Sequence, residues 1–472
     1  MNIVNYIKEK TGNSTDYIYK NIKIGKKEIN IVFCEVLCSS SSINDFVLKK
    51  LTKLKEKDLN NLINLIPENN IKRIKKEDIF NYLNNGFLLL IYKNIIYSIE
   101  VREILDRGVT TIESELSITG PKDSFSENFN TNLGLIRRRI KSNDLWFKEL
   151  NIGKHSNTKT AILYMNNICE KELVDKVINK LNKIDIDGII DSSYLKDILE
   201  EKNNSFFPTI MSTERPDKVS MALLEGKIAI IVDTSSYVLI LPNFFIDFFH
   251  TVDDYYQKSI NTIFNRIIRV FAFFISIFLP AFYIAVTTYN QDAIPLNLLL
   301  ILKSGRSSVP FPAVIEAIFM IISFEILRES DIRMSSTTGT AISILGGLIL
   351  GDAAVQAGII SPIMIIVIAL SSIASFVFTS IELINTNRIY RIIFIILSCL
   401  LGIYGIFIGF LYLLYKIITL TSLDKPYLAP LSPFIKNSLV DAINKDSNIS
   451  IKYRNELLTK NKIRGRYKWK KY

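Results

Sequence analysis

The sequence predicts an α/β soluble N-terminal half, made of two related α/β subdomains, followed by an all-α multi-pass membrane domain. Three observations lead to this fold class. Up to about residue 260 the chain is rich in Lys, Glu, Asn and Asp, as soluble proteins are. From Val270 to Tyr415 it turns strongly apolar, and beyond Ser422 it is polar and basic again. Within the polar half, a strand–turn–helix pattern occurs twice.

These features divide the 472 residues into five predicted parts. They are a first α/β subdomain (1–115), a connecting helical linker (116–154), a second α/β subdomain (155–260), a transmembrane helical domain (261–420) and a basic cytoplasmic tail (421–472). The opening residues, MNIVNYIKEK, lack the apolar core of a cleavable signal peptide, so we expect the N-terminal half to stay in the cytoplasm.

The repeat rests on two pairs of segments in the same order. Glu28–Leu54 and Lys159–Ile184 each read as a buried strand, a polar turn and an amphipathic helix. Asn85–Val101 and Glu225–Leu241 each read as a strand hairpin that follows a glycine. Strand–helix units resemble one another in any case, but two matches in one order favour a duplication.

The polar half carries no motif for catalysis or for a bound cofactor. It has no phosphate loop, no GxGxxG after a strand and no HExxH, and we see no nucleophile–base pair. His155 and His250 are the only histidines, and neither lies at ligand spacing from a cysteine pair, which argues against zinc. We therefore expect no enzyme, no cofactor and no metal, but a docking or sensing module with reduced, structural cysteines.

A basic run ends the predicted linker helix, Ser124–Arg139. Four apolar side chains recur on one face of this helix: Phe125, Phe129, Leu133 and Ile136. Arg137, Arg138 and Arg139 follow at its C-terminus, where cations suit the helix dipole. The three are either a solvated cap or an inter-subunit contact with acids of a neighbouring subunit, and both readings stay open.

Four apolar segments are candidates to span a membrane: Val270–Thr288, Val309–Leu327, Ser361–Thr379 and Ile392–Tyr415. The second contains two acids, Glu316 deep within it and Glu325 near its end. Because an isolated charge at mid-bilayer costs at least about 2.5 kcal/mol, Glu316 must be protonated, paired or facing water. It either joins helices by a hydrogen bond or belongs to an ion pathway.

A stripe of small residues lies between the second and third segments, within residues 338–362. Its members and the polar or apolar residues beside them are Gly339, Ser343, Gly346, Gly347, Leu348, Gly351, Asp352 and Gln356. The stretch either spans fully or re-enters, and only a re-entrant stretch leaves both chain ends on one side. Its shallow face lets another helix approach closely or, in copies around an axis, lines a narrow passage. From the residues alone, helix packing is the stronger reading.

The basic tail is first a topology signal. Residues 422–472 hold twelve Lys or Arg against four Asp or Glu, which favours a cytoplasmic end. We expect anionic lipid as its partner and no nucleic acid, in spite of the net charge of +11.

Several segments resemble the A subunits of GerA-type spore germination receptors. GPKDSFSENFNTNLGLIRRRIK is similar to that family's GPxxxFxExxxTNxxLIRxRI signature, and GDAAVQAGIISPIMIIVIALSSIASF and KPYLAPLSPF also look like family motifs. The likeness covers about residues 100 to 435 and is weak before residue 100.

The resemblance implies an integral protein of the inner spore membrane that acts with a permease-like B subunit and a lipoprotein C subunit. It implies a nutrient-responsive receptor subunit that assembles with copies of itself into a gated cation channel, with Gly346, Gly347, Gly351, Asp352 and Gln356 carried over as pore residues. The alternative is a non-conducting scaffold or signal transducer, including the stage V sporulation paralogue, that acts on a separate channel.

Overall fold

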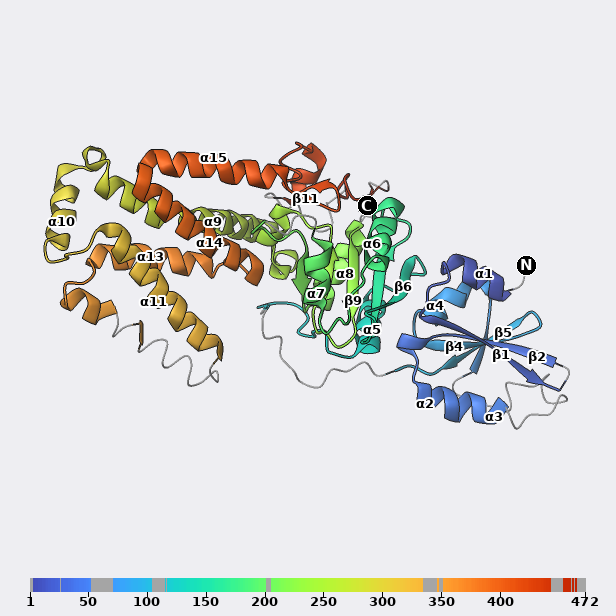
Figure 1. Cartoon of the computed structure of the whole chain (residues 1–472). Helices are drawn as coiled ribbons and strands as arrows, with labels where there is room; N and C mark the ends of the chain where they lie inside the picture. Colours follow the sequence, from blue (N-terminus) through green and yellow to red (C-terminus); the bar gives the residue numbers. More distant parts are fainter. Residues whose placement is uncertain are drawn as a thin grey trace.

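The computed structural model describes residues 3–25, 27–51, 71–103, 115, 117–200, 205–333, 346–347, 351–442, 453–459, 461 and 463–464. Two α/β units and a helical half follow one another along an elongated molecule, with the second α/β unit in the middle (Figure 1). The fold class predicted from the sequence is confirmed.

The first α/β unit is a five-stranded antiparallel sheet with helical segments against it. Its strands are β1 (Tyr17–Ile24), β2 (Lys27–Cys34), β3 (Ile71–Ile74), β4 (Phe87–Tyr92) and β5 (Ile95–Glu100), in the order β1-β2-β4-β5-β3. Its helical segments are α1 (Ile3–Lys10), η1 (Glu35–Leu37), α2 (Ser40–Ser42), η2 (Ile43–Leu48), α3 (Lys49–Leu51), η5 (Lys76–Asp78) and α4 (Ile79–Leu83). The predicted hairpin is β4–β5, in which Tyr92 pairs with Ile95.

The second α/β unit repeats this sheet. Its strands are β6 (Leu145–Ile152), β7 (Thr158–Met165), β8 (Met211–Thr213), β9 (Ile228–Val232) and β10 (Val238–Leu241), in the order β6-β7-β9-β10-β8. Its helices are α5 (Phe129–Arg139), α6 (Lys171–Asn182), α7 (Ser192–Leu199) and α8 (Pro216–Glu225). Equivalent strands occupy equivalent places, as expected of a duplication. The stretch predicted to be the linker contains the edge strand β6. Since β6 pairs along its whole length with β7, this stretch belongs to the second sheet.

The linker helix starts later than predicted. Asn128 caps α5, since its side-chain oxygen accepts a hydrogen bond from the Thr131 amide at 3.0 Å. Before this cap the chain is not helical, and the Phe125 amide donates to the Glu214 carbonyl at 2.8 Å. The apolar face is nevertheless buried as predicted, with Phe125 and Ile136 fully enclosed.

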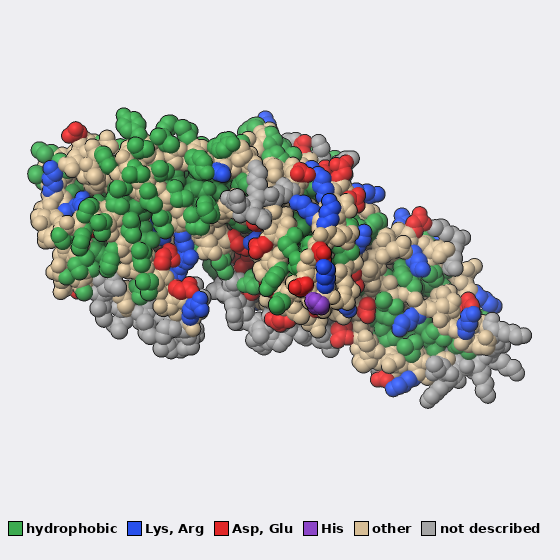
Figure 2. Space-filling view, in the orientation of Figure 1, with side chains coloured by type: hydrophobic (Ala, Val, Ile, Leu, Met, Phe, Trp, Pro, Cys, Tyr) green, Lys and Arg blue, Asp and Glu red, His purple; other side chains and the backbone are tan. Residues whose placement is uncertain are grey.

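The helical half consists mainly of α9 (Ser259–Thr288), α10 (Leu296–Arg306), α11 (Ala313–Arg333), α13 (Pro362–Ser375), α14 (Ile381–Leu401) and α15 (Ile403–Thr419). Shorter elements flank these helices: η6 (Phe245–Phe249), η7 (Val252–Tyr255), η8 (Gln291–Ala293), β11 (Thr421–Ser422), β12 (Lys425–Pro426) and η9 (Lys436–Asp441). Among the described helices, α9 and α14 are long and apolar enough to cross a membrane, and α13 and α15 are shorter apolar helices. Hydrophobic side chains cover the visible face of this half, whereas charged side chains gather over the α/β units (Figure 2).

The prediction of a single span from Ile392 to Tyr415 is wrong. The segment is the end of α14 and the start of α15, which turn back on each other at Gly402, whose φ of +61° favours glycine. A Cβ at Gly405 would lie 2.1 Å from the Leu397 carbonyl oxygen. Because the sequence is apolar across the turn, the sequence pattern did not indicate this hairpin. The glycines allow the two helices to pack closely.

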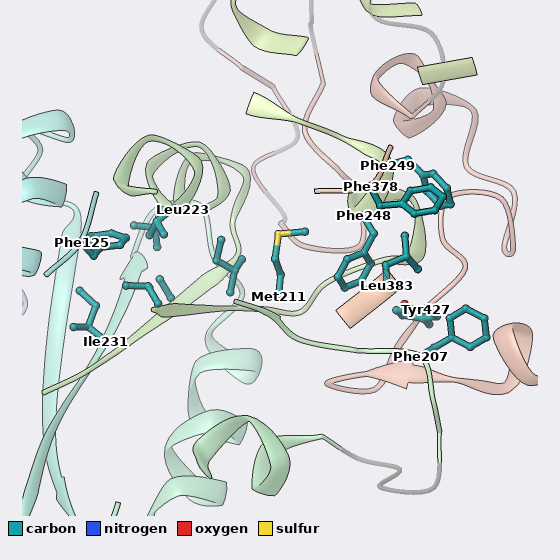
Figure 3. Close-up of a cluster of buried hydrophobic side chains, with 14 of the residues drawn as sticks. Phe125, Phe207, Met211, Leu223, Ile231, Phe248, Phe249, Phe378, Leu383 and Tyr427 are labelled. Carbon is teal, nitrogen blue, oxygen red and sulfur yellow. The ribbon is translucent and has the colours of Figure 1, made fainter. Parts of the chain in front are cut away.

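One hydrophobic core joins the second α/β unit to the helical half. It runs from Phe125 and Ile231 in the α/β unit to Phe249, Phe378 and Leu383 at the base of the helices (Figure 3). Because tightly packed cores transmit displacement, these two parts are expected to move together.

Candidate functional site

The stripe of small residues lies only partly within the described residues. Gly339, Ser343 and Leu348 fall outside them, while Gly346 and Gly347 are helical. Residues 351–356 are helical as well, and the helix ends in a turn at residues 357–358.

The described glycines of the stripe face two different ways. A Cβ at Gly346 would lie 2.9 Å from a methyl carbon of Leu327, so this glycine packs against α11. Outside its own helix, a Cβ at Gly347 or Gly351 would meet no atom of the described residues within 4 Å. The helix therefore has one packed side, and these two glycines open onto space that the described residues outside the helix do not fill.

The two polar residues of the stripe lie on its exposed surface. Gln356 donates a hydrogen bond from Nε2 to Oδ2 of Asp352 at 2.7 Å, and both side chains are exposed. Ala354, between them, is buried instead. Asp352 thus presents a carboxylate one residue after the uncovered Gly351.

Glu316 is buried and paired. It lies in the first turn of α11, where Oε1 is 3.1 Å from a guanidinium nitrogen of Arg306. Its other oxygen accepts hydrogen bonds from the amide and the hydroxyl of Ser361, at 2.9 and 2.8 Å. Because Ser361 is the N-cap of α13, this carboxylate joins α10, α11 and α13 and faces a helix N-terminus that favours negative charge. This geometry matches the helix-joining reading.

Glu325 is the acid at the centre of an arginine cluster. It contacts Arg328 one turn along α11, and its two oxygens lie 3.1 Å from Arg388 and 3.2 Å from Arg391, both on α14. Arg391 is nearly buried, and its guanidinium also lies 3.4 Å from the hydroxyl of Ser371. The cluster links α11, α13 and α14.

Arg137 forms a buried ion pair inside its own chain. Its Nη2 lies 2.7 Å from Oδ2 of Asp16, and neither side chain is exposed to solvent. The same guanidinium donates to the carbonyls of Ser142 and Leu145, at 2.8 and 3.0 Å. Burial opposes the charge, but Asp16, Tyr17 and Cys34 together raise the pKa of Arg137. This arginine joins the two α/β units and is not available to a neighbouring subunit.

The other two arginines of the run lie nearer the surface. Arg139 forms an ion pair with Asp123 and also donates to the Leu135 carbonyl at 3.0 Å. Arg138 is exposed. For Arg138 the inter-subunit contact stays a prediction.

A charged junction that the sequence did not reveal fixes the start of α9. Asp254, in η7, is buried and lies 3.2 Å from Arg266 and 2.7 Å from Arg269. Burial opposes ionisation, but the two arginines hold the pKa of Asp254 below its ordinary value. Arginines three residues apart before an apolar run were the visible signal, but their acidic partner lies in another element.

The C-terminal residues complete this junction. Arg266 donates to the backbone carbonyl of Asp441 at 2.7 Å, and the His250 ring nitrogen lies 2.8 Å from the carbonyl of Ala442. Burial and the neighbouring Arg266 hold the pKa of His250 well below its usual value, so the ring is neutral. The described part of the predicted tail therefore packs against the second α/β unit and α9.

The described residues bring no metal site together: no group of three His, Cys, Asp or Glu side chains among them is arranged to hold an ion. The four cysteines are free thiols. Burial and the nearby Asp16 raise the pKa of Cys34, which keeps its thiol protonated.

Comparisons with known proteins agree along nearly the whole chain. The model of the Bacillus/Clostridium GerA spore germination protein family matches residues 5–457. Spore germination protein KA of Bacillus subtilis (strain 168) is 37% identical over 92% of this chain and 82% of its own length. Spore germination protein GerQA of Bacillus cereus is 35% identical over 96% of this chain and 92% of its own length.

A solved structure is also similar, the N-terminal domain of the A subunit of the Bacillus megaterium spore germinant receptor GerK3. It is 33% identical, covers 51% of this chain and 94% of that chain, and superposes with a TM-score of 0.40. Because the family model spans both α/β units and the helical half, and the two relatives cover nearly all of the chain, this protein belongs to the GerA family of spore germination proteins.

Proposed function

We propose that the chain is the A-type subunit of a nutrient-responsive germinant receptor, and that copies of it assemble around a shared axis into a gated cation-conducting channel. Its relatives, named as spore germination proteins, support the receptor role. The permease-like B subunit and the lipoprotein C subunit are the proposed partners. We propose no catalytic activity.

The main support for the channel proposal is the uncovered side of the small-residue helix. Gly347 and Gly351 leave a shallow strip with open space above it, and the exposed Asp352 follows directly. A strip of small residues on a membrane helix typically packs against another helix and does not face lipid. We therefore expect it to contact another helix or to line a passage. Rings of carboxylates around a passage attract cations, which Asp352 would supply in an assembly of copies.

We place the helical half in the inner spore membrane, with the α/β units and the tail on the core side. Large apolar side chains such as Phe271, Ile373 and Phe407 are more than half exposed, which suits lipid contact. The end of α15 returns to the second α/β unit, where the Ser422 hydroxyl donates to the Thr209 carbonyl at 2.7 Å. Both ends of the helical half therefore meet the same soluble unit. The basic tail would contact anionic lipid.

Cysteine cross-linking tests the shared axis. Gly351→Cys should yield cross-linked dimers of the full-length protein in membranes treated with a short thiol cross-linker, because copies would bring this position together. The new side chain fits without strain, since a Cβ there meets no atom within 4 Å. Cys399 is replaced by Ser in every variant, since the other cysteines are buried.

Ile373→Cys is the matched control. It places a thiol on α13 at a position that is 64% exposed and is expected to face lipid, so it should give monomers. Equal cross-linking at both positions, or none at position 351, would contradict the shared axis and favour a scaffold that acts on a separate channel.

A further inference from the structure

A cavity lies in the helical half, next to the Gly347 end of the small-residue strip. It has a volume of about 190 Å³ and is lined by α11, α13, the segment that follows α13, and α14, together with Gly347. Its polar lining includes Arg328, Arg391, Ser372 and Asp331. A volume of this size holds several water molecules or a small oxyanion.

The cavity lining itself is balanced, with Arg328 and Arg391 against Glu325 and Asp331, and Arg388, which contacts Glu325 but is not in the lining, adds one positive charge. Three guanidinium groups, those of Arg328, Arg388 and Arg391, converge on the single carboxylate of Glu325. Asp331 is the other acid of the lining, and it is exposed. The side chains of Arg328 and Arg391 are only 14% and 4% exposed, so water does little to compensate the excess charge.

The three arginines also have donors to spare. The Nε atoms of Arg328, Arg388 and Arg391 are buried and have no hydrogen-bond partner within the described part of the chain. Buried donors without an acceptor are costly, and a native structure normally pairs them. An oxyanion with several acceptor oxygens would satisfy them and balance the charge at once.

The cluster lies where the helices change from polar to apolar. On α11 the apolar run ends at Leu327, and four of the next six residues, Arg328 to Arg333, are charged. On α14, Arg391 directly precedes the apolar run Ile392–Leu401. Such a boundary on a membrane helix lies near the level of the lipid headgroups, where phosphate groups are abundant and basic pockets between helices bind them.

We propose that this cavity binds a phosphate group through Arg328 and Arg391, which line it, while Arg388 adds positive charge through the Glu325 carboxylate that the three arginines share. The planar guanidinium matches the geometry of phosphate oxygens, and the Ser372 hydroxyl in the lining offers one more donor. An anionic phospholipid headgroup and free inorganic phosphate share this chemistry. The site stands apart from ion conduction and holds whether or not the assembly is a channel.

The test measures binding to full-length protein in a neutral detergent. Phosphatidylglycerol and phosphatidylcholine are titrated by native mass spectrometry, and inorganic phosphate by the shift of the thermal unfolding midpoint. Arg388→Gln should weaken binding about tenfold, because it removes the excess positive charge and leaves Glu325 to compete more strongly for Arg328 and Arg391. Arg333→Gln, which removes the same charge from an exposed pair on α11, should leave it unchanged.

Glu325→Gln is the second variant, and it should act in the opposite direction. Removing the acid that competes for the arginines should tighten binding, which a merely destabilised protein would not do. Tighter phosphatidylglycerol than phosphatidylcholine binding, lost in Arg388→Gln, supports a lipid source. If only the shift of the unfolding midpoint by inorganic phosphate depends on Arg388, the ligand is free phosphate. If neither ligand binds, or if Arg388→Gln and Arg333→Gln behave alike, the site does not exist.

Discussion

Replacing Arg137 with methionine should lower the free energy of unfolding by about 3–5 kcal/mol, the range for breaking a buried ion pair from one side. The substitution leaves the Asp16 carboxylate without its partner in an environment that excludes water, since neither side chain is exposed. It also removes the donors for the Ser142 and Leu145 carbonyls. Thermal and denaturant unfolding of the full-length protein in detergent would measure the loss.

The neighbouring exposed arginine is the control for this loss. Arg138→Met removes the same charge at the surface and should change stability by about 0.5 kcal/mol or less. The double variant Asp16→Asn/Arg137→Met should recover part of the loss, because the stranded carboxylate is gone. If Arg137→Met and Arg138→Met were equally stable, the two α/β units would not depend on this ion pair.

Asp254→Asn should loosen the start of α9, at a cost on the order of 3 kcal/mol, because two buried arginines lose their shared carboxylate. We expect hydrogen exchange to rise in η7 and in the first turns of α9. Asp253→Asn is the matched control, since among the described residues the side chain of this adjacent acid makes only exposed hydrogen bonds, to residues 118 and 119.

The same junction predicts a pH dependence. The folded-state pKa of Asp254 is lowered, so its contribution to the stability of the folded state is present above the ordinary aspartate pKa of about 3.9. That contribution is lost as the pH falls through the folded-state value.

Unchanged hydrogen exchange in α9 for Asp254→Asn would show that other contacts fix this helix, among them the packing of Phe249 and Phe378.

Local patterns predicted the elements whose signal lies within a few residues. The paired strands β4–β5 and β9–β10 and the amphipathic helix α6 were visible because alternation and helical spacing are local properties. The break at Gly402 was not, because apolar residues continue across it and only a positive φ marks the turn. An apolar run indicates that its side chains contact lipid or a protein core, but it does not show where the chain reverses direction.

Side-chain partners were the least predictable part. Asp16 and Arg137 are 121 residues apart and meet only because α5 packs between the two α/β units. From the sequence, Glu316 lies deep within an apolar segment. In the structure it lies in the first turn of α11 and pairs with Arg306 of α10. The sequence located the small-residue stripe and the family likeness suggested its role in a pore, but which of its glycines are covered depends on how the helix packs against α11.

Cation flux through purified protein in liposomes tests the channel most directly. Wild-type protein should pass monovalent cations, Leu348→Ala should widen the passage and raise the flux, and Gly351→Leu should reduce it at least about tenfold by filling the uncovered strip. Gly305→Leu, at a glycine on α10 that also faces open space, is the control and should leave flux unchanged. No cation flux from wild-type protein or Leu348→Ala, or equal flux from Gly351→Leu and Gly305→Leu, would contradict a pore lined by this helix.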